Sequence, residues 1–208
     1  MSSQTPLYPG PGALPGPVEA EQASKDVALG VWIFLMSDAL IFALLFALYA
    51  TMIRATDGGP AGHDVFELKS SLLQTALLLF SSFTCAMASL NLKFRPGQPR
   101  YLLGWWLLTL LLGLTFVALE LKDFMHMAEL GAVPQRSGYL SAFFALVATH
   151  GLHVSAGCLW LILLLVQSQV FGLDAPVRSG FQCLALFWHF LDVIWVAIYA
   201  VVYLQGLM

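Results

Sequence analysis

Charged side chains are scarce in this sequence. They make up 10% of its 208 residues, whereas 59% of the residues are hydrophobic. Soluble globular domains carry about 25% charged residues, so this composition excludes a water-soluble monomer and favours an integral membrane protein. The formal net charge of −3 and the lack of a basic cluster also exclude nucleic acid as a partner.

Cysteines are few, and there is no targeting signal. Cys85, Cys158 and Cys183 lie inside apolar runs and form no CxxC pair. We therefore interpret them as small core residues and not as a disulfide or metal framework. The N-terminus has neither a basic start nor a short apolar core, so it does not resemble a secretory signal. Residues 1–26 are rich in proline and glycine and are predicted to form a flexible tail.

Long apolar runs dominate the rest of the chain. Each of five runs exceeds the roughly 20 residues that cross the hydrocarbon core of a bilayer. Backbone groups in lipid must be hydrogen-bonded internally, so the runs are predicted to be helices. The sequence thus predicts an all-α integral membrane protein with a five-helix bundle over residues 27–208, in which the third helix continues into the amphipathic stretch Lys122–Leu130. The predicted spans are about 27–53, 68–92, 101–121, 139–169 and 180–204.

The basic residues between the spans predict an orientation. The short connection after the second span carries Lys93, Arg95 and Arg100 and no acidic residue, whereas acidic residues gather on the opposite side. Short loops rich in Lys and Arg stay in the cytoplasm. We therefore expect a cytoplasmic N-terminus, with the tail on that side, and a periplasmic C-terminus.

Several ionisable residues interrupt the apolar runs. At a rise of 1.5 Å per residue, Asp38, His150 and Asp192 fall near the middle of their spans. His189 lies three residues before Asp192, and His153 lies three residues after His150, so each pair shares a helix face. Charged groups at this depth face protein or water rather than lipid. We expect the last two helices to meet along these faces and to pair Asp192 with a histidine.

These polar residues allow more than one interpretation. The three histidines could ligate a metal or haem, but the His-x-x-His spacing alone is weak evidence for this. A structural hydrogen-bond network is favoured, since buried polar groups need partners whatever their role. Asp38 could take part in a proton relay, or it could hydrogen-bond Ser37, a neighbouring helix or a lipid headgroup. Glu120 is expected near the outer end of the third helix, as an interfacial residue with Asp123 on its face.

Three segments resemble a known family. They are Ser137–Gly157 (SGYLSAFFALVATHGLHVSAG), Leu184–Gly206 (LALFWHFLDVIWVAIYAVVYLQG) and Phe34–Ala50 (FLMSDALIFALLFALYA). In combination, the THGLHV and FWHFLDVIW motifs are similar to those of subunit III of the haem–copper oxidases, and the similarity covers the chain from about Gly30. Five helices instead of seven, together with the loop Gly58–Leu68, make the cytochrome bo-type ubiquinol oxidases of bacteria the nearest group.

The resemblance implies a subunit without an active site. Haem b, haem o and copper are expected in subunit I, which reduces oxygen and pumps protons, and this chain is expected to bind none of them. The expected partners are subunits I, II and IV and the membrane phospholipids that the family holds in a V-shaped cleft, all in the bacterial cytoplasmic membrane. Asp38 falls where cytochrome c oxidases carry a buried glutamate, so the shorter side chain is a departure from the family.

The expected role is to support assembly and stability of a proton-pumping ubiquinol oxidase. Three alternatives stay open: a five-helix subunit III of a cytochrome c oxidase, the related accessory subunit of a nitric oxide reductase, and a stand-alone haem-binding or transport protein. The interior polar set is predicted to hold the bundle together and to contact lipid headgroups or other subunits. It consists of Asp38, Glu120, His150, His153, His189 and Asp192.

Overall fold

The described part of the chain is mainly helical. The computed structural model describes residues 17–56, 68–94, 99–170 and 172–204, and these contain no strand. Five of the helices are long and apolar enough to cross a membrane, as predicted. They are α1 (Pro17–Met52), α3 (Leu68–Phe94), α4 (Pro99–Glu129), α5 (Gly138–Val170) and α6 (Ala175–Ile198); a short 3-10 helix, Pro134–Arg136, precedes α5, and a π-helix, Tyr199–Leu204, follows α6.

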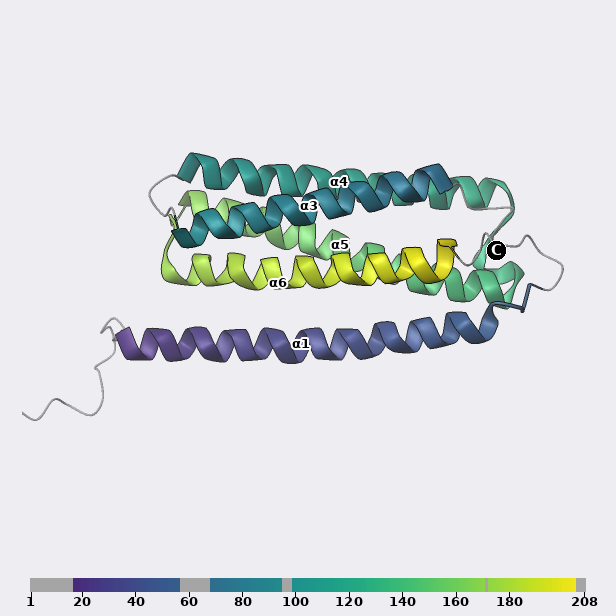
Figure 1. The fold of residues 1–208 in the computed structure, drawn as a ribbon, viewed down its shortest axis with the longest axis horizontal. Helices are drawn as coiled ribbons and strands as arrows, with labels where there is room; N and C mark the ends of the chain where they lie inside the picture. Colours follow the sequence, from purple (N-terminus) through teal and green to yellow (C-terminus); the bar gives the residue numbers. More distant parts are fainter. Residues whose placement is uncertain (1–16, 57–67, 95–98, 171, 205–208) are drawn as a thin grey trace, which may run out of the picture.

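Four of these helices form a closed bundle. Helix α3 packs on α4, α4 on α5, α5 on α6, and α6 closes the ring against α3. Successive helices run in opposite directions, and α1 lies outside the ring along α5 and α6 (Figure 1). This arrangement gives α3, α5 and α6 buried faces toward more than one neighbour, whereas α1 exposes most of its apolar side chains.

The helix ends differ from the predicted span ends. Helix α1 begins at Pro17 and not at Val27, because proline suits the first turn of a helix and the following Glu, Ala and Gln residues favour helix. Residues 1–16 of the predicted tail lie outside the described residues. Helix α4 runs to Glu129, which confirms that the third helix continues past its apolar run.

Helix α4 ends in a glycine motif. The amide of Ala132 donates to the carbonyl of Met127 at 2.9 Å, and the amide of Gly131 donates to that of Ala128 at 3.0 Å. Gly131 has φ +72°, a left-handed conformation that residues with a Cβ adopt at a cost. Two carbonyls of the last turn thus find donors in this Schellman motif, and the chain reverses toward α5.

The end of α1 is tied to the start of α5. The amide of Tyr139 donates to the carbonyl of Ala55 at 3.1 Å. One turn further into the membrane domain, the hydroxyl of Tyr49 lies 3.4 Å from that of Tyr139. These contacts fix the register of α1 against the bundle, which decides the residue of α5 that each side chain of α1 meets.

Candidate functional site

Helix α3 holds α4 through polar side chains. Near one end of the two helices, the carboxylate of Asp123 on α4 accepts hydrogen bonds from Ser70 at 2.8 Å and from Gln74 at 2.7 Å. Further along, the hydroxyls of Thr84 and Thr109 lie 2.8 Å apart in a fully buried contact. Such contacts act as glue between helices in lipid, where no hydrophobic force drives one apolar helix onto another.

The same helix holds α6. The indole N–H of Trp188 donates to the Ser81 hydroxyl at 3.0 Å, and that of Trp195 donates to the Thr75 hydroxyl at 3.1 Å. Between them, Nδ1 of His189 lies 2.7 Å from the Ser82 hydroxyl. Hydroxyl side chains of α3 therefore form hydrogen bonds with both of its neighbours, α4 and α6.

Glycine makes room for the Trp188 ring. A Cβ on Gly113 of α4 would lie 2.7 Å from Cη2 of the ring, and a Cβ on Gly157 of α5 would lie 3.1 Å from Cζ3. Because its N–H reaches α3, this one side chain of α6 contacts the other three helices of the ring. It fixes the distance between them at the level of the polar residues.

Asp38 and His153 form a pair between α1 and α5. Oδ2 of Asp38 lies 3.4 Å from Nε2 of His153, with 7% of the Asp38 side chain exposed and 23% of the His153 side chain exposed. The distance is that of an ion pair, although the geometry is not that of a hydrogen bond, since Oδ2 has no hydrogen-bond partner. The other nitrogen of His153 lies 2.7 Å from the carbonyl of Thr149. Ser37, one of the partners expected for Asp38, donates to the carbonyl of Ile33 instead.

His150 lies in a cage of aromatic rings. Its ring centre is 6.3 Å from that of Phe42 on α1, 5.9 Å from that of Phe116 on α4, and 5.2 Å from that of Trp195 on α6. The residue is fully buried, and neither ring nitrogen has a hydrogen-bond partner in the described chain. The imidazole fills space at the centre of the helices, whereas its neighbour on the same face, His153, makes polar contacts.

Glu120 is buried between α4 and α5. Only 4% of the residue is exposed, and its Oε1 has no hydrogen-bond partner in the described residues. The carboxylate fits because residue 151 is glycine: a Cβ there would lie 2.5 Å from Oε2. An apolar groove lined by Val117, Phe124 and Leu152 runs beside it. The burial of Glu120 agrees with its place in the predicted interior polar set, whereas its position near the membrane interface stays a prediction.

The prediction that Asp192 pairs with a histidine of the preceding helix, α5, is wrong. Asp192 interacts with the Ser82 hydroxyl of α3 and with His189 on its own helix, while His153 faces Asp38. The reason is the ring order of the helices: α6 lies between α3 and α5, and the face that carries Asp192 points toward α3. The shared face of His189 and Asp192 is as predicted, but its partner helix is not.

The three histidine side chains lie in three different environments. Within the described residues, no group of three or more His, Cys, Asp or Glu side chains could hold a metal ion. The three cysteines are buried and unpaired, which confirms their interpretation as core residues. The polar set is thus divided into separate contacts between pairs of helices.

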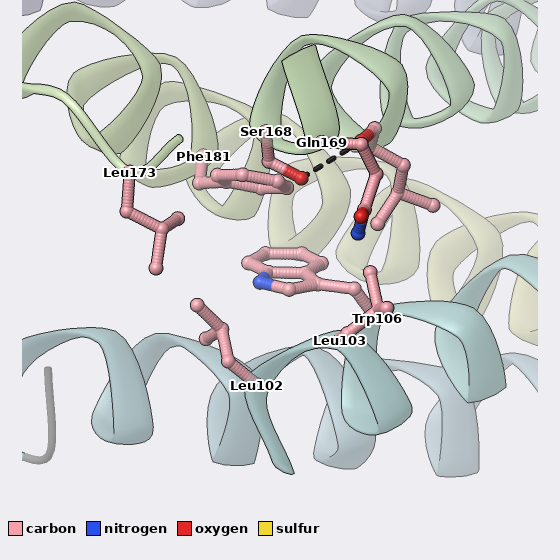
Figure 2. A pocket seen from close by; sticks show the side chains of 8 residues that line it. Leu102, Leu103, Trp106, Ser168, Gln169, Leu173 and Phe181 are labelled. Carbon is pink, nitrogen blue, oxygen red and sulfur yellow. Dashed lines mark hydrogen bonds between the residues drawn. The ribbon is translucent and has the colours of Figure 1, made fainter. Parts of the chain in front are cut away.

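A small cavity lies toward the other end of the bundle, between α4, α5 and the start of α6. It has a volume of about 50 Å³ and is lined by Leu102, Trp106, Ser168 and Phe181, among others (Figure 2). The Trp106 ring stacks on that of Phe181 with centres 4.9 Å apart. Its Nε1 has no hydrogen-bond partner in the described chain, unlike the indole nitrogens of Trp188 and Trp195.

This difference predicts that replacement by phenylalanine lowers the free energy of unfolding by different amounts at the two tryptophans. Trp106 and Trp195 are equally buried, at 1% and 0% exposed. Trp195→Phe loses the hydrogen bond to Thr75, worth about 1 kcal/mol, and leaves that hydroxyl without its donor. Trp106→Phe removes an N–H that has no partner, so its cost is expected to be smaller. The free energy of unfolding of the full chain in mild detergent measures both, and equal losses would contradict the assignment.

The sequence reasoning missed the polar face of α3. Ser70, Gln74 and Ser81 recur at intervals of four and seven residues within an apolar run, which is the spacing of one helix face, and Ser82 adjoins Ser81. That signal was present but weak, because a serine in a membrane helix can also bond to its own backbone. Asp123 likewise appeared only as a neighbour of Glu120, whereas it is the acceptor for α3.

Comparison of the sequence with known proteins identifies the family of this chain. The family model described as "Cytochrome c oxidase subunit III" matches residues 17–207. The chain belongs to the cytochrome c oxidase subunit III family. The match covers all of the helices described above.

Individual relatives agree with this family. The chain is 46% identical over 186 residues to the cytochrome bo(3) ubiquinol oxidase subunit 3 of Pseudomonas putida, covering 89% of each chain. It is 44% identical to the protein of that name from Pseudomonas aeruginosa, covering 90% of this chain and 88% of the relative. A probable quinol oxidase subunit 3 from Staphylococcus aureus is 42% identical and covers 86% of this chain and 89% of its own length.

Proposed function

We propose that this chain is subunit III of a proton-pumping cytochrome bo-type ubiquinol oxidase, in which it has an accessory, non-catalytic role. The observation that supports this most strongly is the similarity to ubiquinol oxidase subunits over nearly the whole length of both chains. In this proposal ubiquinol oxidation and oxygen reduction take place at haem b, haem o and copper in subunit I. Subunits I, II and IV are the protein partners.

The interior polar residues have a structural role in this proposal. Asp38 with His153, Asp123 with Ser70 and Gln74, and His189 with Ser82 each join two helices. A bundle held in this way supports assembly and stability of the complex and presents fixed faces to other subunits and to phospholipids. The placement of Glu120, His150 and Asp192 fits the same role, since each lies between helices.

The location follows from the same proposal. The chain spans the bacterial cytoplasmic membrane with its N-terminus on the cytoplasmic side and its C-terminus in the periplasm. Lys93, Arg95, Arg100 and Arg178 then lie at the cytoplasmic ends of the helices, in agreement with the positive-inside rule. Arg178 donates to the carbonyl of Leu92 at 2.8 Å, so it joins α6 to α3 at that end.

Purification of the complex tests the proposed function. An affinity tag on the C-terminus of this chain, used in mild detergent, is expected to bring down subunits I, II and IV and a preparation that oxidises ubiquinol with oxygen. Reduced cytochrome c and nitric oxide are the matched substrates for the two alternative complexes and are expected to be inert. Turnover of cytochrome c without ubiquinol oxidation would identify a cytochrome c oxidase subunit instead. A Soret band in the chain expressed alone would favour a stand-alone haem protein.

A further inference from the structure

His189 lies halfway through the membrane. The span of α6 runs from Ala175 to Tyr203 and that of α3 from Lys69 to Phe94, so His189 and Ser82 are both near the middle of their helices. At this depth the surrounding hydrocarbon offers no hydrogen bond, and water is absent. Yet His189 is only partly buried by the described chain, so part of its imidazole reaches the outer surface of the seam between α3 and α6.

His153 differs from His189 in the partners of its ring nitrogens. That imidazole is also partly exposed near the middle of its helix, but both of its nitrogens have partners in this chain, Asp38 and the carbonyl of Thr149. His189 engages Nδ1 with Ser82, and no hydrogen bond joins its Nε2 to a described residue. Exposed hydroxyls elsewhere in the spans, on Ser37, Thr115 and Ser155, donate to carbonyls of their own helices.

The contacts of Ser82 fix what His189 can bind. Its hydroxyl lies between Nδ1 of His189 and the carboxylate of Asp192. We assign the carboxyl oxygen of Asp192 as the acceptor of the Ser82 proton, so that the Ser82 oxygen accepts the imidazole proton from Nδ1. Nε2 of the neutral ring is then an acceptor, and a partner group must donate to it.

The side chains around this atom form an apolar surface. Phe83 of α3 and Leu186 and Val193 of α6 are exposed beside the seam, at 55%, 39% and 67%. Lipid covers such side chains well but leaves the acceptor unsatisfied, which is why polar groups at mid-membrane depth face protein or water. A protein helix satisfies both demands, because it can supply apolar contacts and one donor side chain.

From these contacts we propose that the seam between α3 and α6 is a docking face for a transmembrane helix of another oxidase subunit, which donates a hydrogen bond to Nε2 of His189. Donors of suitable chemistry are a hydroxyl, an amide or an indole N–H. The face is defined by Ser82, His189, Asp192, Phe83 and Leu186, and Val193 lies at its border. The inference rests on the proposed membership of a multisubunit oxidase, but it adds which face of this chain meets the partner.

Site-specific cross-linking tests the docking face. A photoreactive amino acid is placed at Val193, beside His189, and in a separate variant at Leu152 of α5, which is 70% exposed on another face. Neither side chain belongs to the polar contacts, so both variants are expected to assemble. The complex is purified, and its oxidase activity shows that it is intact. It is then irradiated and analysed by mass spectrometry. We expect Val193 to cross-link to a transmembrane helix of another subunit in at least tenfold greater yield than Leu152.

Other outcomes overturn the inference. Cross-links from Val193 to phospholipid alone, or to a second copy of this chain, exclude a partner helix at the seam. A higher yield of protein cross-links from Leu152 places the docking face elsewhere. In each of these cases the complex still oxidises ubiquinol, so the proposed function stands although the face is wrong; loss of co-purifying subunits is what would refute the proposed function.

A second variant pair tests the hydrogen bond itself. His189→Gln keeps a polar side chain that can accept, whereas His189→Leu does not. Purified complexes are expected to lose their partner subunits on dilution in detergent about tenfold faster with leucine than with glutamine, the size expected for one strong hydrogen bond between membrane helices. Equal dissociation rates for the two variants, with His189→Gln no faster than the unsubstituted chain, would exclude a donor at Nε2.

Discussion

His153→Leu is expected to destabilise the chain more than Asp38→Leu, although the two substitutions break the same contact. Removing the imidazole leaves the Asp38 carboxyl without a counter-group inside the membrane domain, where it is 5% exposed. Breaking a buried pair in this way costs about 3–5 kcal/mol. Removing the carboxyl leaves an imidazole that still contacts the Thr149 carbonyl, so the loss is nearer the roughly 1 kcal/mol of one contact between membrane helices.

The double substitution Asp38→Leu/His153→Leu is expected to be more stable than His153→Leu alone, because no buried carboxyl remains. The free energies of unfolding of all three variants of the full chain can be measured in mild detergent titrated with a denaturing detergent. Ser37→Ala is the matched control, since Ser37 adjoins Asp38 but bonds only its own helix. Equal losses in the free energy of unfolding for the two single substitutions would mean that the pair does not offset the cost of burying the carboxyl.

Gly151→Ala is expected to be destabilising, by about 1–3 kcal/mol, although alanine favours helix over glycine. The added methyl would lie 2.5 Å from Oε2 and 2.8 Å from Cδ of Glu120. The carboxylate could move away only toward the apolar groove beside it, which exposes a polar group to lipid. The buried carboxylate of Glu120 on α4 therefore requires glycine at position 151 of α5.

Removal of the carboxylate should reverse the sign of this effect. In a Glu120→Ala background the three atoms that lie nearest to the methyl group are absent, so Gly151→Ala is expected to be neutral or to stabilise by up to about 1 kcal/mol, the helix preference of alanine over glycine. Gly104→Ala is the matched control, because no atom lies within 4 Å of a Cβ there. Unfolding in mild detergent measures all four variants; a loss of similar size in both backgrounds would rule out the clash.

Much of the site chemistry could be predicted from the sequence, but not its pairing. The positions of Asp38, His150 and Asp192 along their helices follow from counting residues, since the rise of a helix is constant. Which helix each faces depends on the order of helices around the ring, and no single apolar run contains that information. Asp192 therefore met Ser82 of α3 and not a histidine of α5.

Glu120 shows the same limit from another direction. Its distance from the end of the third apolar run suggested the membrane interface. The helix continues to Glu129, and the glycine at position 151 of the neighbouring helix opens space for the carboxylate. Neither fact is local to Glu120, so no pattern in the surrounding residues predicts which helix makes room for its carboxylate.

The sequence by itself determined that this protein crosses a membrane with five helices, because apolar length and the need to bond every backbone group in lipid leave no other structure for such runs. It also determined the family through motifs in three of those helices. The tertiary structure decided which polar side chains meet, since a helix fixes only the face on which a residue lies. Contacts such as Asp38 with His153 and Ser82 with His189 depend on which faces are brought together, and that depends on all of the helices at once.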